Sequence, residues 1–160
     1  MAEQNENLKM SELIADIKKA GAAELVVEFE YPYVPGVFIS LAHASKQMLR
    51  RLGDEAKEQF FNTRTRQPEE RMNSEKFDKA TSREIIKSWR GLTVAGLRKI
   101  IPGLTTNAAP NTEVPYDEEL AFIIADNSMD FQIWVVNTSM SVENFAKVAE
   151  KKKEQYENLA

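Results

Sequence analysis

Acidic side chains gather late in the chain, where such a cluster could hold a hard cation or form an acid–base pair. Asp117, Glu118 and Glu119 are consecutive, and Asp126 and Asp130 follow shortly after them. Their spacing does not match the loop of a calcium site. Asp117 is better placed to cap a helix, with Glu118 and Glu119 complementing the positive end of its dipole. We therefore expect no metal site here.

The remaining candidates for catalysis are few. His43 is the single histidine and the chain has no cysteine, which excludes disulfide bonds, cysteine nucleophiles and zinc sites with several imidazole or thiolate ligands. Neither a glycine-rich phosphate loop nor a G-x-S-x-G motif occurs. We predict a protein that is not an enzyme and binds no cofactor. A deep polar pocket around His43 would instead favour catalysis.

Charge is unevenly distributed along the chain. Residues 46–102 carry 14 Lys and Arg against 8 Asp and Glu, whereas residues 103–146 carry 7 acidic residues and no basic one. The two stretches could pair within one molecule or head to tail between copies. We expect self-association that weakens as the salt concentration rises. With a net charge of −4, nucleic acid is not an expected partner.

Neither targeting to a membrane nor secretion is indicated. The segment from Met1 to Asn7 is polar and acidic, unlike a secretory signal. No apolar segment approaches the roughly 20 residues that span a bilayer. We expect no membrane partner and a protein that stays in the compartment where it is made.

The N-terminal part shows signals for a helix followed by two strands. Ser11 and Gly21 bound an amphipathic segment, for which Ser11 is the expected cap. Apolar residues then alternate over residues 25–30 and 37–41, which predicts two antiparallel strands joined by a turn. Ser45 is expected to cap a helix that continues to Phe60.

The middle of the chain suggests a boundary. Residues 64–72, which include Pro68, are polar and strongly charged, and we interpret them as an exposed loop. This divides the chain into an N-terminal part (1–63), a linker or loop (64–73) and a helical C-terminal part (74–160).

The C-terminal part reads as a series of short helices. Phe77, Thr81, Ile85 and Trp89 recur every four residues, which predicts a helix that ends at Gly91. Further helices are expected after four capping residues: Thr93, Asp117, Ser128 and Ser141. The expected fold class is α+β, with an N-terminal helix and antiparallel β-hairpin followed by a mainly α-helical part.

The two tryptophans, Trp89 and Trp134, lie on apolar stripes. A large aromatic side chain on such a stripe usually belongs to the core. Tryptophan is also enriched at the energetic centres of protein interfaces. The core interpretation is favoured for both, and an interface role stays open.

Several short motifs occur in an order that suggests a family. They are the strand and capped helix at 37–52, the segment 65–70, Trp-Arg-Gly-Leu at 89–92, Val-Pro-Tyr at 114–116 and Asn-Phe at 144–145. In this order they resemble the tail assembly chaperones of long-tailed bacteriophages. The resemblance runs over roughly residues 37–145.

The resemblance implies a non-catalytic protein of the host cytoplasm. Such a protein binds the tape-measure protein, keeps its apolar helices soluble and recruits tail-tube subunits. The alternative is a structural virion protein, such as a neck, tail-completion or tube-associated subunit. The expected partner-binding residues are Trp89, Arg90, Leu92, Tyr116, Trp134 and Phe145.

Overall fold

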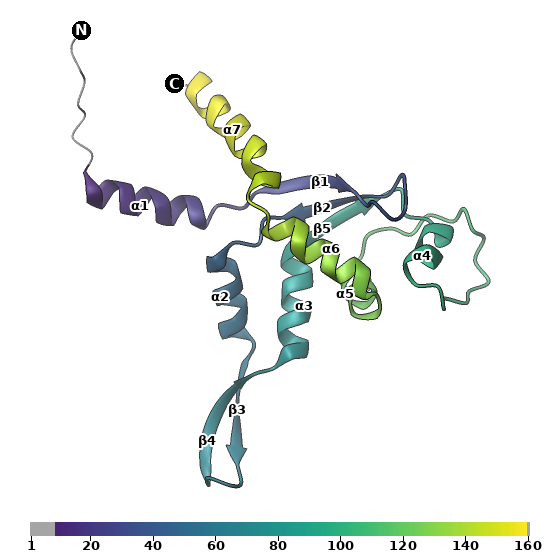
Figure 1. The fold of residues 1–160 in the computed structure, drawn as a ribbon, viewed down its shortest axis with the longest axis horizontal. Helices are drawn as coiled ribbons and strands as arrows, with labels where there is room; N and C mark the ends of the chain where they lie inside the picture. The colour runs from purple at the N-terminus through teal and green to yellow at the C-terminus, as the bar shows by residue number, and fades with distance from the viewer. Residues whose placement is uncertain (1–8, 160) are drawn as a thin grey trace.

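The computed structural model of this chain describes residues 9–159, and these form an α+β protein of seven helices and five strands. Three strands form an antiparallel sheet in the order β1-β2-β5, and two more form a separate hairpin. Figure 1 shows a body built around the larger sheet, from which several parts of the chain project.

The central sheet consists of β1 (Val26–Glu30), β2 (Phe38–Ala42) and β5 (Ile86–Arg90). The alternation that predicted β1 and β2 is confirmed, and the two strands pair antiparallel. Across the three strands Phe29, Ile39 and Trp89 are opposite one another. This row points into the body, because the period of a strand is two and the intervening residues of β1 are exposed.

Two glycines allow the β1–β2 connection and the end of β5 to approach each other closely. Gly36 in the β1–β2 connection and Gly91 after β5 have φ angles of 86° and 75°. Only glycine adopts this left-handed region at no steric cost. A Cβ atom on Gly91 would also collide with the carbonyl oxygen of Gly36. The predicted left-handed stop at Gly91 is therefore present, although it ends a strand rather than a helix.

Trp89 is a correction to the sequence analysis. A helix does form here, and it was expected to start at Asn73 or Ser74; the Asn73 side chain caps it by accepting a hydrogen bond from the Lys76 amide at 3.1 Å. This helix, α3, spans Ser74–Ile85, after which the chain becomes β5. Trp89 therefore lies on a strand. The four-residue spacing was misleading because pairing with β2, a contact distant in sequence, overrides local helix propensity.

The segment interpreted as a loop is a second correction. Helix α2 (Lys46–Glu55) is capped by Ser45 as predicted, but it ends well before Phe60. The chain then forms β3 (Lys57–Asn62) and β4 (Gln67–Met72), which pair antiparallel. The side chain of Asn62 accepts hydrogen bonds from the next turn's amides, and this local turn was not recognised.

The remaining helices are α4 (Val94–Ile100), α5 (Glu118–Asn127), α6 (Met129–Met140) and α7 (Glu143–Asn158). The predicted caps Thr93, Asp117 and Ser128 are confirmed, because each side chain accepts a hydrogen bond from an amide in the first turn. Ser141 is not a cap, since α7 follows Val142 without a side-chain cap. Ser11 is not a cap either, because it lies inside α1.

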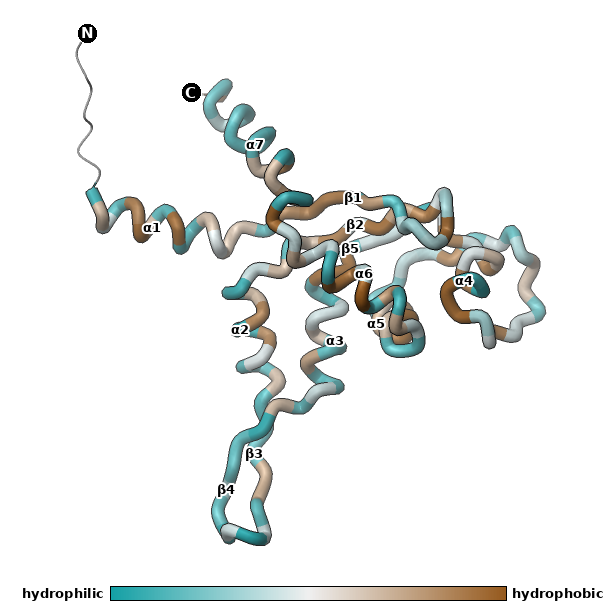
Figure 2. The backbone as a smooth tube through the Cα atoms, viewed as in Figure 1, coloured by the Kyte–Doolittle hydropathy of each residue, from teal (hydrophilic) through white to brown (hydrophobic). Residues whose placement is uncertain are grey.

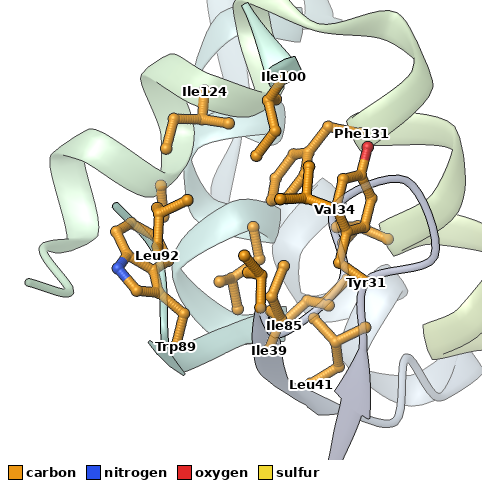
Figure 3. Close-up of a cluster of buried hydrophobic side chains, with 14 of the residues drawn as sticks. Tyr31, Val34, Ile39, Leu41, Ile85, Trp89, Leu92, Ile100, Ile124 and Phe131 are labelled. Carbon is orange, nitrogen blue, oxygen red and sulfur yellow. The ribbon is translucent and has the colours of Figure 1, made fainter. Parts of the chain in front are cut away.

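The core lies between the sheet and the helices that cover one of its faces. Helices α3 and α6 both contact β2. Figure 3 shows side chains from the sheet, from α4, α5 and α6 and from the loop after β1 converging on this space. Its largest fully buried members include Tyr31, Phe131, Ile39 and Leu41. The β5 strand thus joins the predicted C-terminal part to the predicted N-terminal part in one core.

Three parts of the chain project from this body, and we call them the arms. They are α1 (Met10–Gly21), the β3–β4 hairpin at the far end of the α2–α3 pair, and most of α7. Helix α1 has no buried residue. In Figure 2 the hairpin is mainly hydrophilic, whereas α1 alternates hydrophobic and hydrophilic residues.

Candidate protein-docking surface

Helix α6 has apolar residues both on the face that packs into the body and on its exposed side. One face packs into the body through Phe131, Val135 and Ser139, which are all buried. The other face carries an exposed row, which we call the α6 row. Its members with their exposed fractions are Met129 (70%), Ile133 (49%), Val136 (37%) and Met140 (52%).

The spacing of the α6 row is that of a helix-pairing seam. Its residues are separated by four, three and four positions. This alternation places side chains along one line of a helix, where a second helix can interlock with them. The row contributes little to the core, because its side chains are exposed while another face of α6 packs into the body. The row is therefore available to another polypeptide segment.

The local structure holds α6 firmly in place. The Ser128 hydroxyl accepts a hydrogen bond from the Phe131 amide at 3.3 Å, which fixes the start of the helix. The Tyr31 ring lies edge-on to the rings of Phe131 and Trp134, with centroids 5.6 and 5.0 Å away. Burial, together with the negative charge of Asp130, raises the pKa of Tyr31 to about 12. The phenol is therefore neutral, and α6 presents its row from a rigid base.

A small cavity of about 110 Å³ opens beside the row, between α3, α5 and α6. Val136 lines both the cavity and the row, and Phe77 and Ile85 contribute further apolar walls. Among the described residues, the buried hydroxyls of Thr81 and Ser82 at this cavity lack a hydrogen-bond partner. Such hydroxyls need water or an incoming polar group.

The basic middle and the acidic stretch of the chain are not joined by close ion pairs. The ion pairs of the basic middle run to neighbours such as Glu24, Glu28 and Glu58. Over residues 46–146, all of which the structure describes, no ion pair joins the basic stretch 46–102 to the acidic stretch 103–146. On α6, Asp130 has no ion-pair partner among the described residues.

No family model, curated protein or solved structure is found to match this chain. Its function is therefore inferred from the docking surface and from the residues around it. Over the described part of the chain, the helices are too short or too polar to pass through a bilayer.

Three of the predicted partner-binding residues come together, but inside the body. Trp89 and Leu92 are buried, and the Trp89 indole donates a hydrogen bond to the Val114 carbonyl at 2.8 Å. The Tyr116 ring lies 5.0 Å from the Trp89 ring, and its hydroxyl donates to the Ile86 carbonyl at 2.7 Å. The Val-Pro-Tyr motif therefore anchors the chain against β5.

The other three predicted residues lie apart from this group and from one another. Phe145 is buried against Phe29 and His43, with ring centroids 5.7 and 5.0 Å away. Trp134 is half-buried on α6. Arg90 is exposed, and it donates hydrogen bonds to both carboxylate oxygens of Glu28. Of the six, Arg90 is the most open to a partner; partner binding by the set stays a prediction.

The acidic cluster and His43, which were considered first for chemistry, have contacts that belong to the fold. Asp117 accepts a hydrogen bond from the Leu120 amide at 2.9 Å, as expected for a cap. With Glu118 and Glu119 it also lines a cleft opposite three basic residues of α3. Burial lowers the pKa of His43. Within residues 9–159, no group of three or more His, Cys, Asp or Glu side chains is placed to hold a metal ion.

The α6 row was missed by the sequence analysis, although its signal is present. The sequence predicted a helix after Ser128 with one apolar stripe over residues 131–136, and it did not separate a buried face from an exposed one. A second reading of the same helix at the four-three-four spacing would have found Met129, Ile133, Val136 and Met140. A helix with two apolar faces in a small protein indicates a docking surface.

Proposed function

We propose that this protein is a non-catalytic assembly chaperone that holds an amphipathic helix of another polypeptide along α6. The observation that carries the proposal is the exposed α6 row on a helix whose other face is fully packed. An amphipathic helix binds such a surface by placing its own apolar residues between those of the row. Binding would remove both apolar faces from water.

The client that we propose is the tape-measure protein of a long-tailed bacteriophage, with tail-tube subunits recruited afterwards in the host cytoplasm. This identity is supported by the resemblance of the motifs at 37–52, 89–92 and 114–116 to tail assembly chaperones. Those motifs have definite structural roles here, since Trp89, Gly91 and Tyr116 fix the chain around β5. A long helical client offers many amphipathic segments, which suits a row of this kind.

The test is co-expression with a candidate tape-measure protein, followed by affinity capture. The variant Ile133→Asp places a charge at the centre of the row and should lower client binding about tenfold or more. Tyr156→Asp on α7 is the control, because Tyr156 is also exposed (76% against 49% for Ile133) but lies outside the row. Equal capture by both variants would contradict the proposal.

The alternative, a structural virion protein, is favoured by one observation. The three arms have few contacts with the body, and parts of this kind often become ordered contacts in a larger assembly. Mass spectrometry of purified particles separates the two functions. A stoichiometric amount of this chain in the particle supports a virion subunit, and its absence supports a chaperone.

A further inference from the structure

Helix α1 has an exposed apolar row of its own, which we call the α1 row. Its members are Met10 (62% exposed), Ile14 (47%) and Ile17 (61%). The helix has 12 residues and buries none of them. Isolated helices shorter than about 12 to 15 residues are marginal in water, so tertiary contacts normally supply their stability. Helix α1 is therefore expected to need a surface to pack against.

The α1 row and the α6 row have the same spacing. Met10, Ile14 and Ile17 are separated by four and three positions, and the next position in the series is Gly21. The α6 row is separated by four, three and four positions. The four-three-four spacing is the same in both directions along a helix. Two helices with these rows can therefore interlock in layers, whichever way they run.

Charge decides between the two directions. If the helices run antiparallel, Lys18 of α1 lies close to Asp130 of α6, and the negative end of one helix dipole meets the positive end of the other. If they run parallel, Asp130 lies level with Ser11, beside the acidic Glu12. Among the described residues, neither Lys18 nor Asp130 has an ion-pair partner. The antiparallel arrangement is favoured.

We propose that α1 of one copy of this chain docks antiparallel on the α6 row of a second copy. Three layers carry the contact: Met10 with Met140, Ile14 with Val136 and Ile17 with Ile133 of the second copy. Gly21, at the fourth position, forms no layer, because the Gln47 side chain of its own chain covers it. The Nε2 atom of Gln47 lies 3.0 Å from where a Cβ atom of residue 21 would be.

The occupant is a second copy rather than the same chain. In Figure 1 α1 runs away from the body and from α6, and it joins β1 through the short segment 22–25. Its polar contact with the body is to α2, where the Gln47 side chain donates to the Lys18 carbonyl at 3.4 Å. A row held outward in this way is presented to another molecule.

The contact has two consequences. Because it joins different surfaces of the two copies, it can repeat and generate a ring or an open filament. It also covers the α6 row before a client arrives. This second consequence rests on the proposed function, since α1 and the client then compete for one row. A client would release one copy from its neighbour as it binds.

Cysteine trapping tests the contact directly, because the chain contains no cysteine of its own. Two full-length preparations with different tags carry one substitution each, Met10→Cys and Met140→Cys, and are mixed with oxidised glutathione. We expect a disulfide-linked dimer that carries both tags. The matched control pairs Met10→Cys with Met129→Cys, the parallel partner, at the opposite end of the α6 row.

Three results would overturn the proposal. They are no trapped dimer for the pair Met10→Cys and Met140→Cys, equal trapping of the control pair, or exclusive closure within one chain that carries both substitutions. The last result would mean that α1 folds back on its own α6. Preferential trapping between copies supports the antiparallel contact.

A second pair of variants separates this proposal from the proposed function. Ile14→Asp lies on α1 and should lower self-association about tenfold or more without weakening client binding. Ile133→Asp should weaken both. If Ile14→Asp leaves the mass distribution unchanged in light scattering, the contact between copies is wrong and the client site is unaffected. If Ile133→Asp loses self-association but keeps the client, the contact stands and the client site is wrong.

Discussion

The body and the arms use apolar residues in opposite ways. In the body, Phe131 and Val135 of α6 are almost completely removed from water by neighbours of the same chain. On α1, Met10, Ile14 and Ile17 occur at comparable helical spacing and have no such neighbours. The same kind of pattern thus stabilises one region and leaves another dependent on a partner. Periodicity alone does not distinguish the two cases.

The largest test of this difference compares one substitution in each region. Phe131→Ala should lower the free energy of unfolding by about 3–5 kcal/mol, because it leaves a cavity in the core. Ile17→Ala on α1 should change it by no more than about 0.5 kcal/mol at concentrations where the protein is monomeric. Urea unfolding followed by circular dichroism measures both. Similar losses would mean that α1 belongs to the body.

A second test concerns the backbone that closes the body. Gly91→Ala should destabilise the protein by about 3 kcal/mol, since the left-handed conformation costs about 1–2 kcal/mol and the new Cβ meets the Gly36 carbonyl. Gly103→Ala is the control, because nothing lies within 4 Å of the added atom. Its effect should stay within about 0.5 kcal/mol. Urea midpoints for the two variants give the comparison.

Helix caps allow a smaller test. Asp117→Ala removes the hydrogen bond to the Leu120 amide and should cost about 1 kcal/mol, because α5 is part of the body. Ser141→Ala should cost almost nothing, since Ser141 does not cap α7. Thermal unfolding of the two variants checks the difference. A loss of stability in Ser141→Ala comparable to that in Asp117→Ala would contradict the assignment.

The smallest expected effect is a dependence on pH. Burial beside Phe145 lowers the pKa of His43 below its ordinary value of 6.5, so the unfolded chain binds a proton more readily than the folded one. Stability should therefore fall as the pH is lowered through the unfolded pKa. The single imidazole resonance reports the folded pKa. His43→Gln should show a weaker fall in stability between pH 7.5 and 5.5.

The sequence predicted local features well because each depends on a few adjacent residues. At the caps Ser45, Thr93 and Ser128, a hydroxyl accepts a hydrogen bond from the amide three residues later, which no carbonyl of the helix can pair. The β1–β2 pair followed from simple alternation. These features are set by the period of the backbone and by turn chemistry.

The sequence could not place features that depend on distant partners. Trp89 is on a strand because β2 lies beside it, and nothing within 73–91 reveals that neighbour. The β3–β4 hairpin was missed because Phe60 continues the helical spacing of α2 and most residues of β4 are polar or charged, so the usual pattern of a strand is lacking. For the candidate site, α6 was expected as a helix, but which of its apolar faces would remain exposed depended on where Tyr31 and the sheet lie.

The hairpin arm has a consequence for behaviour at high concentration. It is a ribbon of two strands with open edges, a shape that in other proteins recruits further strands and seeds fibrils. Here Pro68 removes a backbone donor from β4, and Lys57, Glu70 and Arg71 crowd the strands with charge. Concentrated solutions of this protein should therefore resist amyloid growth from the hairpin. Any ordered polymer should instead be held together by contacts between helices.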